Sequence, residues 1–180
     1  QVEEFTYSSQ HLPAGFEGCT IVQLSDLHGA EFGENNRKLL QAVLDADPDY
    51  IFLTGDLQDR FRETPQSYVF DLCQRLQAIA PTYYVTGNHE WAAGVVPELE
   101  PLLEECGVNV LSNEYLVLEQ NGDRLALLGA EDPNGYANQK TVGQLADQVR
   151  GEQGDIYQIL LSHRNNKYED YAAARVDLTL

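Results

Sequence analysis

The sequence predicts a mixed α/β fold in which a largely parallel sheet lies beside a partly antiparallel one. In the first part of the chain, short apolar runs alternate with segments of helical period, as in parallel strands joined by crossover helices. Farther on, Asn121-Gly122 separates two strand-like segments and is the strongest short signal for a β-hairpin. The 180 residues, 43% of them apolar, predict one domain, 1–180, with a sizeable core.

Four apolar runs have the length of strands that are buried on both faces. They cover residues 19–25, 50–53, 82–86 and 156–161. Because the hairpin is antiparallel and the alternating region is not, we expect two sheets rather than one. The other expected strands are an edge strand at 2–9, the hairpin strands at 115–119 and 124–128, and the start of a last strand at 177–180.

Helices are predicted where caps and prolines bracket apolar positions of helical period. The expected segments run from Asn36 to before Pro48, from Pro65 to before Pro81, from Pro97 to Gly107, and from about Thr141 to Arg150. The first of these helices should turn one apolar face inward, formed by Leu39, Leu40, Val43 and Leu44.

Polar residues that can bind a metal follow each of the four runs. The segments are Asp26-Leu27-His28, Gly55-Asp56, Gly87-Asn88-His89-Glu90 and Ser162-His163. Open sheets with crossover helices bind their ligands at the carboxyl ends of the strands. We therefore expect these side chains to meet at one edge of the fold.

The candidate metal ligands offer carboxylate, imidazole and amide donors: Asp26, His28, Asp56, Asn88 and His163. This mixed set suits Mn, Fe, Zn or Ni better than Ca or Mg. The alternation of an extended strand would put Asp26 and His28 on one side, and Asp56 can bridge two ions. Two ions roughly 3.5 to 4 Å apart lower the pKa of a shared water toward about 7 and clamp a phosphoryl group. The residues thus predict hydrolysis of phosphate esters by a dinuclear centre with a bridging hydroxide.

His89 is adjacent to Asn88, so the two side chains would point in different directions. We assign His89 to the substrate side, as the general acid that protonates the leaving oxygen or stabilises its charge. Asp59 is the expected partner that holds the His89 imidazolium, and Arg60 is expected to offer a fork of donors to phosphate oxygens.

Three neighbours of these motifs are expected to have other roles. Glu90 should brace its loop rather than bind metal. Arg164 is expected to be an exposed loop residue, the alternative being that it touches a substrate. Trp91 either lines the substrate entrance or covers the core.

The formal net charge of −18 argues against a protein that binds nucleic acid through a basic surface. It does not argue against anionic substrates, because bound dications reverse the local field around a cluster of acids. The net charge is therefore compatible with small phosphorylated substrates.

Four motifs, in this order, resemble the calcineurin-like metallophosphoesterase superfamily: S-D-L-H (25–28), G-D-L-Q-D-R (55–60), G-N-H-E (87–90) and L-S-H (161–163). The flanking L-P-A-G-F-E-G and F-G-E-N-N-R-K-L-L are similar to the bacterial YkuE-type phosphoesterases, and the resemblance spans residues 10–180. It implies a four-layer α-β-β-α sandwich with a dinuclear centre at the sheet edge. In the family pattern, Asp26 and His28 would bind one metal, Asp56 would bridge, and Asn88 and His163 would bind the other. His89 with Asp59 would form the catalytic pair.

One departure from the family concerns the end of the chain. The family closes its site with a G-H-x-H segment that adds a histidine to each metal, whereas this chain stops at Leu180. We expect the fold to lack its C-terminal part through truncation, the alternative being a protein with a defective metal site. The chain also opens on Gln1 and contains no methionine, so we expect it to have been trimmed at its start.

The resemblance implies a metal-dependent phosphohydrolase with two divalent ions, Mn being favoured for assay. A nucleotide, another phosphodiester and a lipid-linked phosphate are not separable as substrates. The alternatives are a non-catalytic, protein-binding member of the same fold and a fragment that is inactive without the G-H-x-H ligands. The YkuE-type resemblance suggests membrane proximity or export of the full-length protein, while a cytoplasmic location stays open.

Overall fold

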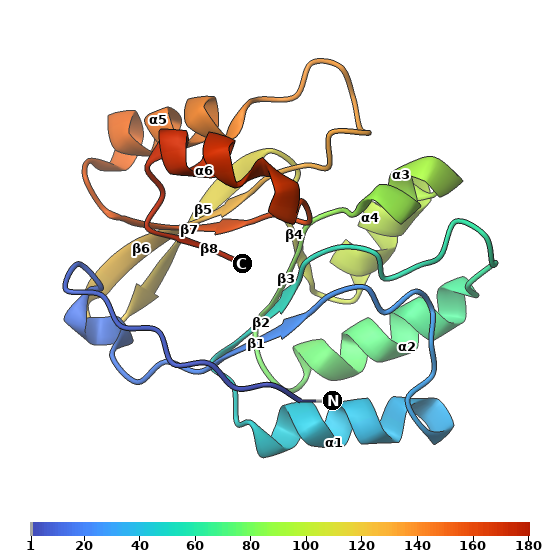
Figure 1. Ribbon diagram of the computed structural model, residues 1–180. Helices are drawn as coiled ribbons and strands as arrows, with labels where there is room; N and C mark the ends of the chain where they lie inside the picture. The colour runs from blue at the N-terminus through green and yellow to red at the C-terminus, as the bar shows by residue number, and fades with distance from the viewer. Residues whose placement is uncertain (1) are drawn as a thin grey trace.

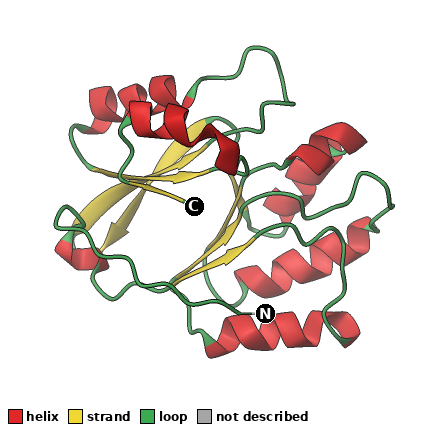
Figure 2. Ribbon diagram, in the orientation of Figure 1, coloured by secondary structure: helices red, strands yellow, loops and turns green. Residues whose placement is uncertain are grey.

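The computed structural model describes residues 2–180, in which two four-stranded sheets lie face to face between two layers of helices (Figures 1 and 2). The first sheet is entirely parallel and has the order β1-β2-β3-β4. Its strands are β1 (Ile21–Leu24), β2 (Tyr50–Leu53), β3 (Thr82–Tyr84) and β4 (Asn109–Val110). The connecting helices are α1 (Arg37–Asp45), α2 (Gln66–Gln77), α3 (Asn88–Ala93) and α4 (Val96–Glu105).

The second sheet has the order β5-β6-β7-β8, and only its first pair is antiparallel. Its strands are β5 (Glu114–Gln120), β6 (Asp123–Gly129), β7 (Tyr157–Leu161) and β8 (Leu178–Thr179), and its crossover helices are α5 (Val142–Gln153) and α6 (Tyr168–Ala174). The β5–β6 turn places Asn121 at φ 51° and Gly122 at φ 87°. Two successive positive φ values are the geometry that favours Asn-Gly in a two-residue hairpin, so this prediction is confirmed.

Alternation along the strands divides the core into three apolar layers. In β2, Ile51 and Leu53 pack under the helices α1, α2 and α4, whereas Phe52 faces the other sheet. In β6, Leu127 faces the space between the sheets and Leu128 packs under α5 and α6. Successive side chains of a strand point to opposite faces, so one apolar run fills two layers. The result is the expected four-layer α-β-β-α sandwich.

The helices largely follow their predicted signals. α4 is followed by Cys106 and by Gly107 with φ +85°, after which the Val108 N–H donates to the Leu103 carbonyl at 3.0 Å. That bond is the mark of a helix closed by a left-handed glycine. α5 begins after Thr141, whose side chain accepts a hydrogen bond from the Gln144 N–H at 3.2 Å. Asn36 precedes α1 but does not cap it, because its side chain accepts from the Phe32 N–H.

Two predictions about the first part of the chain are wrong. Residues 2–9 form no strand, because their backbone pairs with neither sheet, although the Tyr7 hydroxyl donates to the Asp177 carbonyl. Leu44 is 52% exposed, because the 100° rotation per residue carries it past the face that Leu40 and Val43 bury. The short elements β4, α3 and α6 were not predicted.

Candidate metal centre and active site

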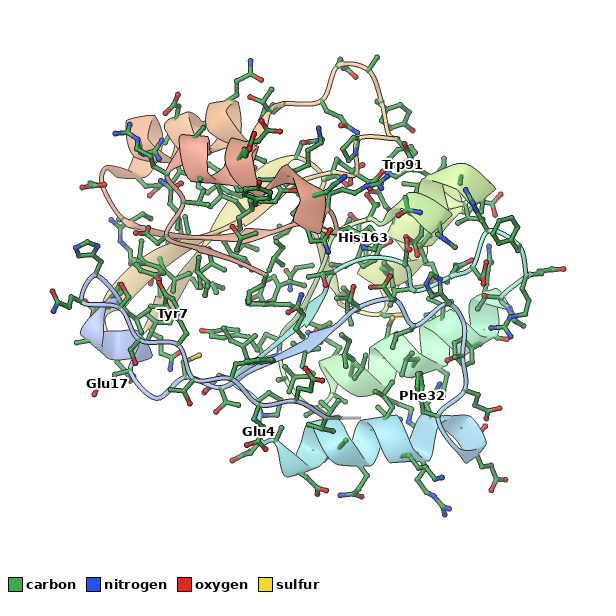
Figure 3. All side chains as sticks on the ribbon, in the orientation of Figure 1. Glu4, Tyr7, Glu17, Phe32, Trp91 and His163 are labelled. Carbon is green, nitrogen blue, oxygen red and sulfur yellow. The ribbon has the colours of Figure 1, made fainter. Side chains whose placement is uncertain are left out.

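The candidate ligands follow the strands at one edge of the sandwich, four of them on loops and Asn88 at the start of α3. In Figure 3, His163 lies where the ends of the two sheets meet, with Trp91 on α3 nearby. Asp26, His28 and Asp56 all have left-handed backbone, with φ of 56°, 50° and 54°. The predicted alternation of Asp26 and His28 along an extended strand is therefore wrong. Their side chains nevertheless come together, with Asp26 Oδ1 3.6 Å from His28 Nε2.

Backbone hydrogen bonds continue between the loops after β1 and β2 have ended. The Asp26 N–H donates to the Gly55 carbonyl at 3.1 Å, and the His28 N–H donates to the Asp56 carbonyl at 2.8 Å. These bonds hold the left-handed residues in place, where such conformations cost of order 1–3 kcal/mol each. Backbone strain that the surrounding structure enforces is typical of functional sites.

Glu90 joins the loops that follow β2 and β3. Its side chain is fully buried, and its Oε2 accepts the N–H groups of Asp56 and Gly87, both at 2.9 Å. Its Oε1 accepts the Gln58 N–H at 3.0 Å. Burial raises the pKa of Glu90, although these N–H donors oppose the rise. The geometry agrees with the expectation that Glu90 braces the loop.

Gly87 is required where these two loops touch. A Cβ at this position would lie 2.1 Å from Asp56 Oδ1 and 2.4 Å from the Asp56 backbone nitrogen. No side chain fits in that space, so the backbone after β3 approaches the Asp56 carboxylate directly. The close approach brings Asn88 and His89 within reach of Asp56.

The Asp56 carboxylate lies at the centre of the candidate site. Its Oδ1 accepts the His89 N–H at 2.8 Å, and its Oδ2 lies 3.3 Å from His163 Nε2 and 4.0 Å from His28 Nε2. Burial by itself would raise the pKa of Asp56, but hydrogen bonds with His163 and His89 outweigh it and lower the pKa. Asp56 is therefore an anion that reaches the donors on both sides.

His163 is oriented by the backbone of the β2 loop. Its Nδ1 lies 2.8 Å from the Thr54 carbonyl, and its Nε2 lies 3.1 Å from Asn88 Oδ1. Burial lowers the pKa of this imidazole, but the contacts with Asp56 and Thr54 outweigh it and raise the pKa to about 9. A ring that donates Nδ1–H to a carbonyl turns Nε2 toward a metal, as metal-binding histidines commonly do.

The structure brings candidate donors for divalent cations together around Asp56. The donor atoms of Asp26, His28 and Asp56 lie within 4.8 Å of one another, as do those of His28, Asp59 and His89. On the other side of Asp56, His163 Nε2 lies 3.3 Å from Asp56 Oδ2 and 3.1 Å from Asn88 Oδ1. The ring of His28 also has a buried Nδ1 with no hydrogen-bond partner among residues 2–180, while its Nε2 faces the carboxylates. The nitrogen and oxygen donors suit transition metals.

The predicted catalytic pair lies beside these groups. His89 Nδ1 is 3.4 Å from Asp59 Oδ1 and also 3.3 Å from the Arg60 backbone N–H. This nitrogen therefore has an acceptor when it carries a proton and a donor when it does not. His89 Nε2 is 3.9 Å from Asp56 Oδ2, so the other nitrogen faces the candidate centre. The Arg60 guanidinium lies over the ring of the exposed Phe61, 4.4 Å from its centroid.

Arg164 and Asp132 form an ion pair at this edge that the sequence alone does not predict. Arg164 is not an exposed loop residue, because its side chain is 28% exposed and forms a bidentate ion pair with Asp132. Asp132 follows β6, whose carboxyl end lies at the same edge as that of β7. The polar segment Gly129–Gly135 after an apolar strand was the available signal. Trp91 donates its indole N–H to Thr86 and packs edge-on against Tyr136.

A double sandwich with mixed nitrogen and oxygen donors at the strand ends defines a protein of the metallophosphoesterase type. The model of the calcineurin-like phosphoesterase family matches residues 19–178, and the chain belongs to this family. The chain is 33% identical over 153 residues to a metallophosphoesterase of Caenorhabditis elegans, an alignment that covers 82% of this chain and 31% of that protein. The family supports binding of divalent metals and phosphoric ester hydrolase chemistry.

Other relatives are more distant or much longer than this chain. It is 27% identical over 140 residues to YkuE of Bacillus subtilis, covering 73% of this chain and 48% of YkuE. It is 29% identical over 180 residues to a transmembrane protein with a metallophosphoesterase domain of Bos taurus, covering 94% and 40%. The chain thus spans less than half the length of these relatives. Within residues 2–180, no helix has the length and apolar character needed to cross a bilayer.

A solved structure supports the fold. The sulfate thiohydrolase SoxB of Thermus thermophilus superposes with a TM-score of 0.59 at 14% identity, covering 88% of this chain and 46% of SoxB. At this identity the likeness concerns the arrangement of sheets and helices alone.

Replacing Glu90 with Gln should destabilise the fold by about 2–3 kcal/mol, because one of the three N–H groups would then face the amide donor of Gln. Urea unfolding measures this loss, and amide exchange should accelerate at Asp56, Gln58 and Gly87. The exposed helical change Glu105→Gln is the matched control. Equal stability and equal amide protection in the two variants would show that Glu90 does not hold the loops.

Glu131 should make the stability of the fold depend on pH. Burial, together with the nearby Glu100 and Asp132, raises its pKa to about 7 from 4.5 despite the hydrogen bonds with Thr86 and Trp91. The folded chain therefore keeps a proton that the unfolded chain releases between these values, and stability falls as the pH rises. Glu131→Gln removes this titration.

The free energy of unfolding of Glu131→Gln, relative to that of the wild type, should rise by up to about 3 kcal/mol between pH 4.5 and pH 7.5. Urea unfolding at each pH measures this difference. Glu119→Gln removes an exposed carboxylate from β5 and should show no such gain. A constant difference between Glu131→Gln and wild type across this range would refute the proposed titration.

Proposed function

We propose that the chain is a metal-dependent phosphoesterase that hydrolyses phosphate mono- or diesters at a dinuclear metal centre. The observation that carries the proposal is the position of the buried Asp56 carboxylate between two groups of donors. Its Oδ2 lies 4.0 Å from His28 Nε2 and 3.3 Å from His163 Nε2. One carboxylate within reach of both groups is what a bridging ligand requires.

In this proposal, Asp26 and His28 hold one ion, Asn88 and His163 hold the other, and Asp56 belongs to both. When bound, the ions would supply positive charge for the phosphoryl oxygens and a more acidic water. The donors suit Mn, Fe, Zn or Ni, and Mn²⁺ is the first choice for assays. Asn88 contributes an amide oxygen that is already oriented, because Oδ1 lies 3.1 Å from His163 Nε2.

His89 is proposed to donate a proton to the leaving oxygen. Its Nε2 faces Asp56, while Asp59 accepts from Nδ1 on the far side of the ring and orients it. A general acid that keeps its orientation in both protonation states can donate its proton and then take up another one. Arg60 is the proposed donor to substrate oxygens, since its guanidinium lies on the loop that carries Asp59.

The proposed substrate is a small phosphorylated molecule, either a nucleotide, another phosphodiester or a lipid-linked phosphate. Relatives named as transmembrane proteins with a metallophosphoesterase domain, together with the distant likeness to YkuE, support membrane proximity of the whole protein as a further part of the proposal. The alternative of a non-catalytic binding module gains no support from this site. Its donor atoms converge, whereas binding alone would not require their convergence.

Asp56→Asn should reduce both metal content and turnover, because an amide offers one oxygen and no charge where two groups of donors need an anion. We expect close to two metal ions per wild-type chain in elemental analysis after loading with Mn²⁺. Hydrolysis of bis-p-nitrophenyl phosphate should fall by roughly a hundredfold or more in the variant. Asp155→Asn, at an exposed position before β7, is the control. Wild-type turnover in Asp56→Asn would exclude the proposed bridging role.

His89→Asn should lower kcat in a manner that depends on the leaving group. A general acid contributes roughly 10²–10⁴-fold, and a leaving group that needs no proton does not use it. We therefore expect a large loss of kcat for phenyl phosphate and a small one for p-nitrophenyl phosphate, with unchanged metal content. Asp59→Asn should show the same dependence more weakly. Equal losses for both esters would assign His89 to binding rather than to proton transfer.

A further inference from the structure

The ion pair between Arg164 and Asp132 lies at the edge of the sandwich that carries the candidate centre. Arg164 Nε is 2.5 Å from Asp132 Oδ2, and Nη2 is 3.0 Å from Oδ1. Asp132 is only 1% exposed, and its Oδ1 also accepts the Asn134 N–H at 2.9 Å. A buried carboxylate with a fixed backbone donor holds the planar guanidinium in one orientation.

Both residues are tied to the proposed ligands of the second ion. Arg164 directly follows His163 in the chain, and the Tyr171 hydroxyl donates to the Arg164 carbonyl at 2.7 Å. The Asp132 N–H reaches Thr86 Oγ1 at 3.4 Å, and Thr86 stands two residues before Asn88. The two partners of the ion pair thus belong to segments that adjoin His163 and the start of α3, where Asn88 lies.

The contacts of Arg164 leave part of its guanidinium for a ligand. Asp132 occupies Nε and Nη2, and among residues 2–180 the two N–H groups of Nη1 have no acceptor, so they remain for a ligand. The field of Asp56 also acts on Arg164 and, after the hydrogen bond with Asp132, contributes to its raised pKa. Since a buried ion pair by itself is weak support for stability, orientation of the guanidinium is the better explanation of this one.

We propose that Arg164, positioned by Asp132, is an anion subsite that binds a second charged oxygen of the substrate. This inference rests on the proposed function and narrows its substrate class. A phosphate monoester carries about −1.5 to −2 charges at pH 7, whereas a diester carries about one. A fixed cation beside the centre favours the more highly charged group, so the chain should prefer monoesters and terminal diphosphates over diesters.

The test uses the Mn²⁺-loaded full chain as wild type and as Arg164→Met, Arg164→Lys and Asp132→Asn. Arg124→Met is the control, since it removes an arginine from the opposite end of β6. Binding of inorganic phosphate is measured by calorimetry, and kcat/KM is measured for p-nitrophenyl phosphate and for bis-p-nitrophenyl phosphate. Metal content and thermal unfolding are recorded for each variant.

Arg164→Met should bind phosphate about tenfold more weakly or worse and should lose more kcat/KM for the monoester than for the diester, at unchanged metal content. Arg164→Lys cannot make the bidentate pair and should be intermediate. Asp132→Asn keeps the Arg164 guanidinium but removes the ion pair that orients it, so phosphate binding should weaken about threefold or more. The control should match the wild type.

Wild-type phosphate binding in Arg164→Met would overturn the inference, as would equal losses for monoester and diester. If Arg164→Met does not fold, Arg164→Lys decides in the same way, because binding equal to that of the wild type refutes the subsite. A wild type that binds phosphate through Arg164 but hydrolyses neither ester would contradict the proposed function and leave the subsite standing. A wild type that binds no phosphate would contradict the subsite directly.

Discussion

The buried Glu90 carboxylate joins the loops after β2 and β3, and the geometry of the candidate site follows from that contact. The N–H groups of Asp56, Gln58 and Gly87 lie beyond the ends of the strands, where no neighbouring strand can accept them. Leaving such donors buried and unpaired costs about 1–3 kcal/mol each. Glu90 accepts all three from the first turn of α3. One side chain therefore fixes the distance between the loop of Asp56 and the start of α3, which carries Asn88 and His89.

The same region stores strain in its backbone. Asp26, His28 and Asp56 are left-handed, and the bonds between the β1 and β2 loops hold them so. An extended continuation of β1 would send Asp26 and His28 along the sheet instead of turning them toward Asp56. The side chains of Asp26 and His28 thus reach Asp56 only because the backbone adopts these strained conformations. The strained residues are themselves candidate metal ligands. Fold stability and site geometry depend on the same few hydrogen bonds.

Much of this arrangement could be predicted from the sequence, because its pattern of apolar and polar residues indicates where strands end. The four apolar runs have strand length, and each is followed by a residue that can bind metal, so the edge of the sheet was predictable. The prediction of an edge strand at 2–9 was wrong, because a local sequence pattern does not indicate whether a neighbouring strand is available for pairing. The contact of Arg164 with Asp132 joins residues 32 positions apart through a loop without periodicity. Only the folded chain brings them together.

The electrostatics of this edge couple folding to cation binding. Asp56, Glu90, Glu131 and Asp132 are all buried at or beside it. Arg164 pairs with Asp132 and His163 with Asp56, while within residues 2–180 neither Glu90 nor Glu131 lies in an ion pair. Ionising Glu90 or Glu131 without a counter-charge is costly, in line with the raised pKa of each. Divalent cations that bind only the folded chain would offset that cost by mass action. In the proposed function, loss of Asp56 would then remove both the chemistry and the part of the stability that cation binding supplies.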